Sequence, residues 1–210
     1  MNHLILSDTH LSDKFDEKKF NYLKKLIEAT DRVILNGDFW DGYLTSFEDF
    51  VKSEWRELFP LLRAKKAVYL FGNHDLPSFS DARVKLFSAM QGMVHHLKVD
   101  GKRLKIEHGH RFFFNGYPRL FALARMREKM IEYMMSAFGK DYINFAAWNE
   151  KMKSWVAKGL GQREILVCGH THFPEFNLKE KFINLGFIDK GYSSYLKIQG
   201  KEMKLVEERY

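Results

Sequence analysis

The chain has 210 residues, of which 45% are hydrophobic and 29% are charged, and these fractions exclude a disordered or collagen-like protein. The longest stretch without Asp, Glu, Lys or Arg, residues 86–97, has twelve residues, whereas a membrane-spanning helix needs about 20 apolar residues, so we predict no transmembrane helix. The formal charge of +7 favours anionic partners, and the single cysteine, Cys168, excludes an internal disulfide and a metal site made of thiolates.

The first half of the chain alternates short apolar runs with amphipathic stretches. Three apolar runs predict strands at residues 3–6, 33–35 and 67–71. Three amphipathic stretches predict helices at residues 16–29, 47–62 and 82–90. This alternation indicates an α/β domain with a largely parallel sheet, so we expect the loops after the strands to line up along one sheet edge. Two further strands, at 93–99 and 103–107, are joined through Asp100-Gly101, a strong hairpin signal.

Residues 111–163 have a different character, with five of the nine methionines and no strand-like alternation. Apolar residues recur there at helical spacing, at Leu120, Leu123, Met130, Ile131 and Met134. We therefore predict a helical insertion at 111–163 in a core made of residues 1–110 and 164–210. The tail of the chain returns to predicted strands at 164–168, 181–185, 193–198 and 201–206, with a turn at Gly200-Lys201.

Six of the nine histidines fall in short polar motifs that follow predicted strands. The motifs are Asp8-Thr9-His10, Gly37-Asp38, Gly72-Asn73-His74-Asp75, His108-Gly109-His110 and Gly169-His170-Thr171-His172. Any one of them is a weak signal, but a motif after a parallel strand projects from the carboxyl end of the sheet, where α/β proteins build their sites. Their shared placement therefore predicts one common site.

The series of motifs resembles that of the calcineurin-like metallophosphoesterases, which bind two metal ions in a four-layer α/β/β/α sandwich. The resemblance runs from Asp8 to His172 and covers the core but not the helical insertion. It implies that Asp38 bridges the two cations. The other ligands that it implies are Asp8, His10 and His172 for the first metal, and Asn73, His108 and His170 for the second.

The chemistry of the motifs agrees with this resemblance. Two divalent cations roughly 3.5–4 Å apart repel each other, and a shared carboxylate offsets that repulsion. Imidazole, carboxylate and amide ligands suit Mn²⁺, our first expectation, with Fe²⁺, Zn²⁺ and Ni²⁺ as alternatives. The resemblance further implies that a metal-bridging hydroxide attacks phosphorus and that His74 protonates the leaving oxygen. Asp75 follows His74 directly, and we expect it to orient the His74 ring.

Four further residues are candidates for contacting the substrate. His110 either approaches the substrate phosphate or caps a loop, and Trp40 either lines the site or belongs to the core. Arg111 and Arg119, at the beginning of the basic insertion, are candidates for binding an anionic group.

The insertion carries most of the excess positive charge, because residues 111–163 contain ten Lys or Arg and four Asp or Glu. It is also rich in aromatic residues, among them Phe112, Phe113, Phe114, Tyr117, Phe121, Phe138, Phe145, Trp148 and Trp155. Beside a phosphoester site, this composition predicts a substrate with an anionic head and either an apolar tail or stacking bases. The alternative is a cap that packs on its own apolar face and leaves its lysines in solvent.

Three classes of substrate follow. The first is a UDP-linked lipid, because the insertion resembles the helical cap of the UDP-2,3-diacylglucosamine pyrophosphatases, which are cytoplasmic enzymes of the membrane surface. The others are nucleic acid and a small phosphoester. A non-catalytic scaffold is disfavoured because every implied ligand is present. We expect a cytoplasmic protein, with peripheral contact to the inner membrane surface or to nucleic acid through the insertion, and infer no obligate protein partner.

Overall fold

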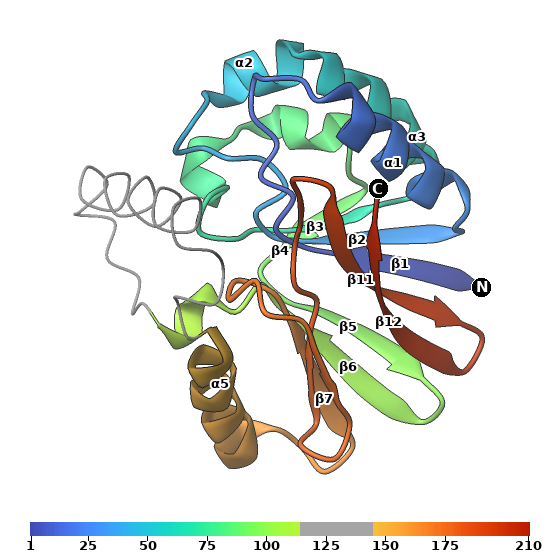
Figure 1. Ribbon diagram of the computed structural model, residues 1–210, viewed down its shortest axis with the longest axis vertical. Coiled ribbons are helices and arrows are strands. Elements are labelled where there is room, and N and C mark those ends of the chain that lie inside the picture. The colour runs from blue at the N-terminus through green and yellow to red at the C-terminus, as the bar shows by residue number, and fades with distance from the viewer. Residues whose placement is uncertain (114–144) are drawn as a thin grey trace.

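Two β-sheets pack face to face and helices cover their outer faces (Figure 1). The computed structural model describes residues 1–113 and 145–210. Residues 114–144 lie outside the described residues, and with them lie Arg119 and the apolar stripe predicted from Leu120 to Met134. The described ends of the predicted insertion form a 3₁₀ turn at His110–Phe112 and the helix α5 at Phe145–Gly159.

The first sheet has the strand order β10-β11-β1-β2-β3-β4, and β12 pairs with β11. Its strands are β1 Asn2–Leu6, β2 Arg32–Asn36, β3 Val68–Leu70, β4 Met90–Gly92, β10 Ile188–Asp189, β11 Tyr192–Gln199 and β12 Glu202–Arg209. Strands β1 to β4 are parallel, as their helical connections predict. Their carboxyl ends therefore lie at one edge, and β11 runs antiparallel to β1.

The second sheet has the order β5-β6-β7-β9-β8. Its strands are β5 His95–Val99, β6 Lys102–Ile106, β7 Glu164–Cys168, β8 Glu175–Asn177 and β9 Phe182–Asn184. The predicted hairpin at Asp100-Gly101 joins β5 to β6, and both turn residues have positive φ (47° and 72°), as a tight hairpin turn requires. Strands β6, β7 and β9 are parallel, so this sheet also gathers carboxyl ends at one edge.

The predicted helices agree in part with the structure. Helix α1, Glu17–Glu28, begins where Asp16 accepts a hydrogen bond from the Lys19 backbone N–H at 3.0 Å. The helix predicted at 47–62 is instead divided into α2 (Phe47–Lys52), a 3₁₀ turn (Glu54–Leu58) and α3 (Phe59–Ala64). The division falls at Ser53, which has extended backbone angles and whose hydroxyl donates to the Phe50 carbonyl.

The helix predicted at 82–90 is wrong. The chain forms a 3₁₀ turn at Ala82–Leu86 and then enters β4, the edge strand of the first sheet. The pattern misled because Val84 and Phe87 are both buried at a spacing of three, which a 3₁₀ turn satisfies as well as an α-helix.

Three apolar clusters define four layers. Helices α1 to α3 cover the outer face of the first sheet, with Leu23 and Leu62 buried there. Ile5 and Ile106 belong to the cluster between the two sheets. Helix α5 packs its Met152 on the outer face of the second sheet. The α/β/β/α sandwich predicted from the sequence is confirmed, and no helix among the described residues is long and apolar enough to cross a membrane.

Candidate metal centre

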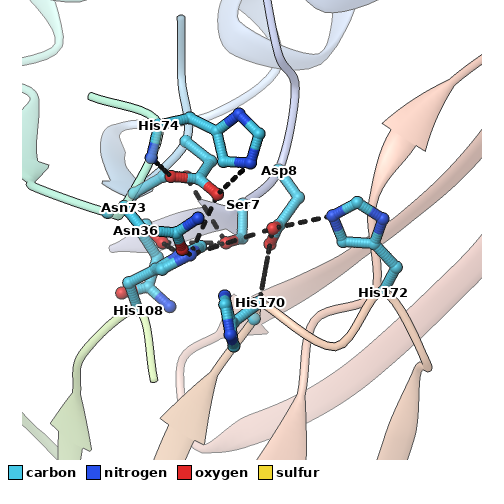
Figure 2. A network of polar contacts seen from close by, with 12 residues as sticks. Ser7, Asp8, Asn36, Asn73, His74, His108, His170 and His172 are labelled. Atoms are coloured by element: carbon cyan, nitrogen blue, oxygen red, sulfur yellow. Dashed lines mark hydrogen bonds and ion pairs between the residues drawn. The ribbon is translucent and has the colours of Figure 1, made fainter. Parts of the chain in front are cut away.

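The predicted site residues come together at the edge where the two sheets place the carboxyl ends of their parallel strands (Figure 2). Strands β1, β2 and β3 of the first sheet lead to the loops that carry Asp8, Asp38 and Asn73. Strands β6 and β7 of the second sheet lead to His108 and His170. Five loops that are far apart in the sequence thus build one centre.

A first ligand group consists of Asp8, His10 and His172, whose candidate ligand atoms all lie within 4.8 Å of one another. The Nε2 atom of His172 lies 3.1 Å from Oδ1 of Asp8 and 3.2 Å from Nε2 of His10. Two imidazole nitrogens at this distance repel each other unless a proton or a cation lies between them. The group therefore suits a cation shared by two imidazoles and a carboxylate.

A second ligand group consists of Asp38, His108 and His170, again within 4.8 Å. Nε2 of His108 lies 3.1 Å from Oδ2 of Asp38 and 3.1 Å from Oδ1 of Asn73. Nδ1 of His108 donates to the Asn36 carbonyl at 3.0 Å, since a carbonyl oxygen can only accept. In the neutral ring this leaves the lone pair on Nε2, on the side of the carboxylate and amide oxygens, as a metal ligand requires.

Asp38 also contacts the loop after β3, because its Oδ1 accepts the backbone N–H of His74 at 2.8 Å. The two groups adjoin through His108, whose Nε2 lies 4.0 Å from Oδ1 of Asp8. Asp38 lies with the second group, so its bridging of both cations stays a prediction.

Five of the seven candidate ligands have positive φ, namely Asp8 (55°), His10 (45°), Asp38 (51°), His170 (70°) and His172 (57°). Non-glycine residues rarely adopt this left-handed conformation, and it persists where the surrounding structure dictates it, often at functional sites. Two glycines make room for the carboxylates. A Cβ at Gly72 would collide with Asp38, and one at Gly169 would collide with Asp8.

The buried charges of the centre determine which groups carry protons. Burial alone would raise the pKa of Asp8, but His108 and His172 lower it to about 2. Burial would lower the pKa of His10, but Asp41, Asp38 and Asp8 raise it to about 10. Likewise, Asp38 and Asp8 overcome burial and raise the pKa of His108 to about 9. In the metal-free protein, these two histidines are therefore protonated at neutral pH.

Metal binding to the apoprotein is expected to release protons and to strengthen as the pH rises. A cation must displace the protons of His10 and His108, and this competition weakens as the pH approaches their raised pKa values, by about tenfold in affinity per pH unit for each proton released. Calorimetric titration of the apoprotein with Mn²⁺ at pH 6, 7 and 8, in buffers of different ionisation enthalpy, measures both effects. An affinity independent of pH would contradict these protonation states.

His74 forms an ion pair with Asp41 and not, as the sequence predicted, with Asp75. Nδ1 of His74 lies 3.1 Å from Oδ2 of Asp41, and its Nε2 lies on the side of Asp38, 4.0 Å from Oδ2. The same oxygen of Asp41 lies 3.4 Å from Nδ1 of His10. One carboxylate therefore lies beside two rings of the centre.

The carboxylate of Asp75 is directed at backbone instead. It accepts the N–H groups of Gly72 at 2.6 Å, Asp38 at 3.1 Å and Phe39 at 2.7 Å. Burial and the charge of Asp38 raise the pKa of Asp75 to about 6. Asp75 thus ties the loop after β3 to the loop after β2 and shapes the centre without contacting the His74 ring.

The four predicted substrate contacts have different outcomes. Trp40 belongs to the core, since its indole N–H donates to the Tyr69 hydroxyl at 3.2 Å and its ring stacks on Phe50, which contradicts a substrate contact. The His110 ring lies beside the centre, 5.5 Å from that of His108, and burial together with the charge of His108 lowers its pKa to about 4. A contact from His110 to the substrate stays a prediction.

Arg111 forms an ion pair with the buried carboxylate of Glu107, and its guanidinium lies over the Phe112 ring. This pairing satisfies the charge of Arg111 within the protein, so its contact with the substrate stays a prediction. Arg119 lies outside the described residues.

The four-layer sandwich thus gathers carboxylates and imidazoles at one sheet edge, in groups that could hold metal ions. Residues 1–192 match the calcineurin-like phosphoesterase superfamily domain, and the chain belongs to this superfamily.

Solved structures share the fold at low sequence identity. An archaeal phosphodiesterase is 18% identical, with 99% of each chain covered and a TM-score of 0.51. Yfce, a phosphoesterase from E. coli, is 17% identical, with 98% of each chain covered and a TM-score of 0.52. No curated protein sequence matches the chain.

Proposed function

We propose that the protein is a dinuclear metal-dependent phosphohydrolase that cleaves a phosphodiester or pyrophosphate bond. The observation that carries the proposal is the adjacency of the two ligand groups, with His74 beside them as a proton donor. Membership of the phosphoesterase superfamily supports the class of reaction.

The described residues fit two divalent cations. Asp8, His10 and His172 would hold one, and Asp38, Asn73, His108 and His170 the other. The fit rests on the close approach of the His10 and His172 nitrogens and on the His108 ring, whose Nδ1 is bound to a carbonyl. We propose Mn²⁺ first, because these nitrogen and oxygen ligands suit it, as they do Fe²⁺, Zn²⁺ and Ni²⁺. When bound, such cations supply an activated water as nucleophile and neutralise the phosphoryl charge.

The protein's own contribution is a positioned acid in a buried site. Burial alone would lower the pKa of His74, but Asp38 and Asp41 raise it above its ordinary value, which favours the protonated ring that can act as an acid. The Asp41 carboxylate lies 3.1 Å from Nδ1, so Nε2, on the side of Asp38, is the nitrogen placed to protonate the leaving oxygen. Asp8 and Asp38 are almost inaccessible to solvent, so their charges are weakly screened.

For the substrate, we propose a UDP-linked lipid, which the protein would reach from the cytoplasm at the inner surface of the membrane. The observation that favours it lies on α5, where Trp155 is 55% exposed and stands between the exposed Lys151 and Lys158. These residues, at spacings of four and three, share one helix face, and an exposed Trp flanked by lysines suits an anionic membrane surface. Nucleic acid and small phosphoesters are the alternatives.

A panel assay tests the function and the substrate together. The protein is incubated with Mn²⁺ and bis-p-nitrophenyl phosphate, a UDP-linked lipid or single-stranded DNA, each at two salt concentrations. We expect Mn²⁺-dependent hydrolysis that a chelator abolishes, with the lipid cleaved fastest in mixed micelles. Salt-sensitive cleavage of DNA would favour nucleic acid instead. Absence of metal-dependent turnover with every substrate would support a non-catalytic scaffold.

A further inference from the structure

Helix α5 belongs to the predicted insertion, yet one of its side chains reaches the loop that carries two candidate metal ligands. Asn149 is fully buried on α5. Its Oδ1 accepts the hydroxyl proton of Thr171 at 2.7 Å, and its Nδ2 donates to the Phe173 carbonyl at 3.0 Å. The amide thus binds the residues on both sides of His172.

All the hydrogen-bonding positions of the Asn149 amide are occupied. The second acceptor position of Oδ1 is taken by Nδ2 of Asn184 at 3.0 Å, and the second N–H is directed at the Glu175 carboxylate, also at 3.0 Å. Nδ2 of Asn184 lies 2.8 Å from Oγ1 of Thr171, which closes a triangle of Asn149, Thr171 and Asn184. All three residues are fully buried, where a polar group is costly unless every partner is in place.

The loop that this triangle holds is conformationally strained. Thr171 stands between His170, with φ of 70°, and His172, with φ of 57°. Both residues come from the loop after β7 (Figure 2), and each belongs to a different ligand group. Because left-handed non-glycine residues persist only where the surroundings dictate them, the hydrogen bonds to Thr171 and Phe173 fix how the two rings enter the centre.

We propose that Asn149 is a positioning residue for the metal centre, acting through Thr171 on His170 and His172. The inference rests on the proposed function in taking these histidines as ligands. It gives α5 a second role besides covering the sheet. The partners behind metal ligands typically contribute roughly 10–100-fold to metal affinity, and we expect an effect of that size here.

The test measures Mn²⁺ binding by calorimetry and metal content by elemental analysis, without any substrate. Asn149→Ala and Thr171→Val are each expected to bind Mn²⁺ at least about tenfold more weakly than the wild type. Thr171→Ser, which keeps the hydroxyl, is expected to restore most of the affinity lost in Thr171→Val. The double variant is expected to lose less than the product of the two single losses, because both break the same link.

Val156→Ala is the matched control, since it removes packing from the same helix two turns further on without touching the polar triangle. It is expected to lower Tm but to keep wild-type metal affinity. The proposal is overturned if Thr171→Val binds Mn²⁺ like Thr171→Ser, or if Val156→Ala loses as much affinity as Asn149→Ala. Failure of the proposed function is a separate outcome, in which the wild type itself does not bind two equivalents of Mn²⁺.

Discussion

Replacing Asp38 with Asn is expected to abolish Mn²⁺-dependent hydrolysis of bis-p-nitrophenyl phosphate, lowering kcat/KM by at least about 10³-fold, or roughly 4 kcal/mol of transition-state stabilisation. The substitution keeps the shape of the side chain and an oxygen that can still accept the His74 backbone N–H. It removes the negative charge that lies 3.1 Å from Nε2 of His108. Two cations would then face each other without the carboxylate that offsets their repulsion.

The measurement combines kcat/KM with metal content per chain and a circular dichroism melt. Asp16→Asn is the matched control. It also removes one carboxylate, at the beginning of α1, where Asn caps a helix as well as Asp does, so activity is expected to stay at the wild-type level. An Asp38→Asn protein with activity within about tenfold of the wild type would remove Asp38 from the bridging role.

The placement of the centre was predictable because it depends on topology more than on side-chain detail. Parallel strands end at a common edge, so polar residues just after β1, β2 and β3 had to meet once the strands were recognised. The second sheet contributes in the same way through β6 and β7. For this reason the order of the motifs was sufficient to predict one common site, whereas the division into two ligand groups came from the resemblance to the metallophosphoesterases.

The direction of individual side chains was less predictable. Asp75 is the sequence neighbour of His74, but the turn directs its carboxylate to the backbone of Asp38 and Phe39. Asp41 reaches the ring from the loop after β2 instead. Neighbourhood in the chain says little about orientation in a tight turn, where φ and ψ decide where each side chain points.

Short strands and the buried hydrogen bonds of Asn149 were also not predicted from the sequence. Strands β8 and β10 have three and two residues, too few to show alternation. Asn149 lies three and seven positions before the buried residues Met152 and Val156. Asn149 is therefore a polar residue on the apolar face of its helix, and this position was the available signal that its side chain forms buried hydrogen bonds.

His74→Gln is expected to lower kcat by about 10²–10⁴-fold while metal content and KM stay near the wild-type values. The Nε2 atom of His74 lies 4.0 Å from the nearest Asp38 oxygen, as expected for an acid beside the centre, and Gln cannot donate a proton as imidazolium does. The loss depends on the leaving group. A p-nitrophenolate needs little protonation, so a phenyl diester should lose more than a p-nitrophenyl diester when both are assayed by phosphorus NMR.

Asp41→Asn removes the carboxylate beside His74 but keeps the His74 imidazole, so it tests what Asp41 contributes to the acid. Burial lowers the pKa of His74, and the Asp41 carboxylate is one of the groups that raise it, so the variant should titrate at lower pH. Because an acid works only while protonated, the alkaline limb of the kcat profile is expected to shift to lower pH. Metal content must be measured in parallel, since Asp41 also contacts His10. His96→Gln, on the exposed side of β5, is the control.

For the His74→Gln variant, loss of metal would make His74 a ligand, and equal losses of kcat with both leaving groups would make it a structural residue.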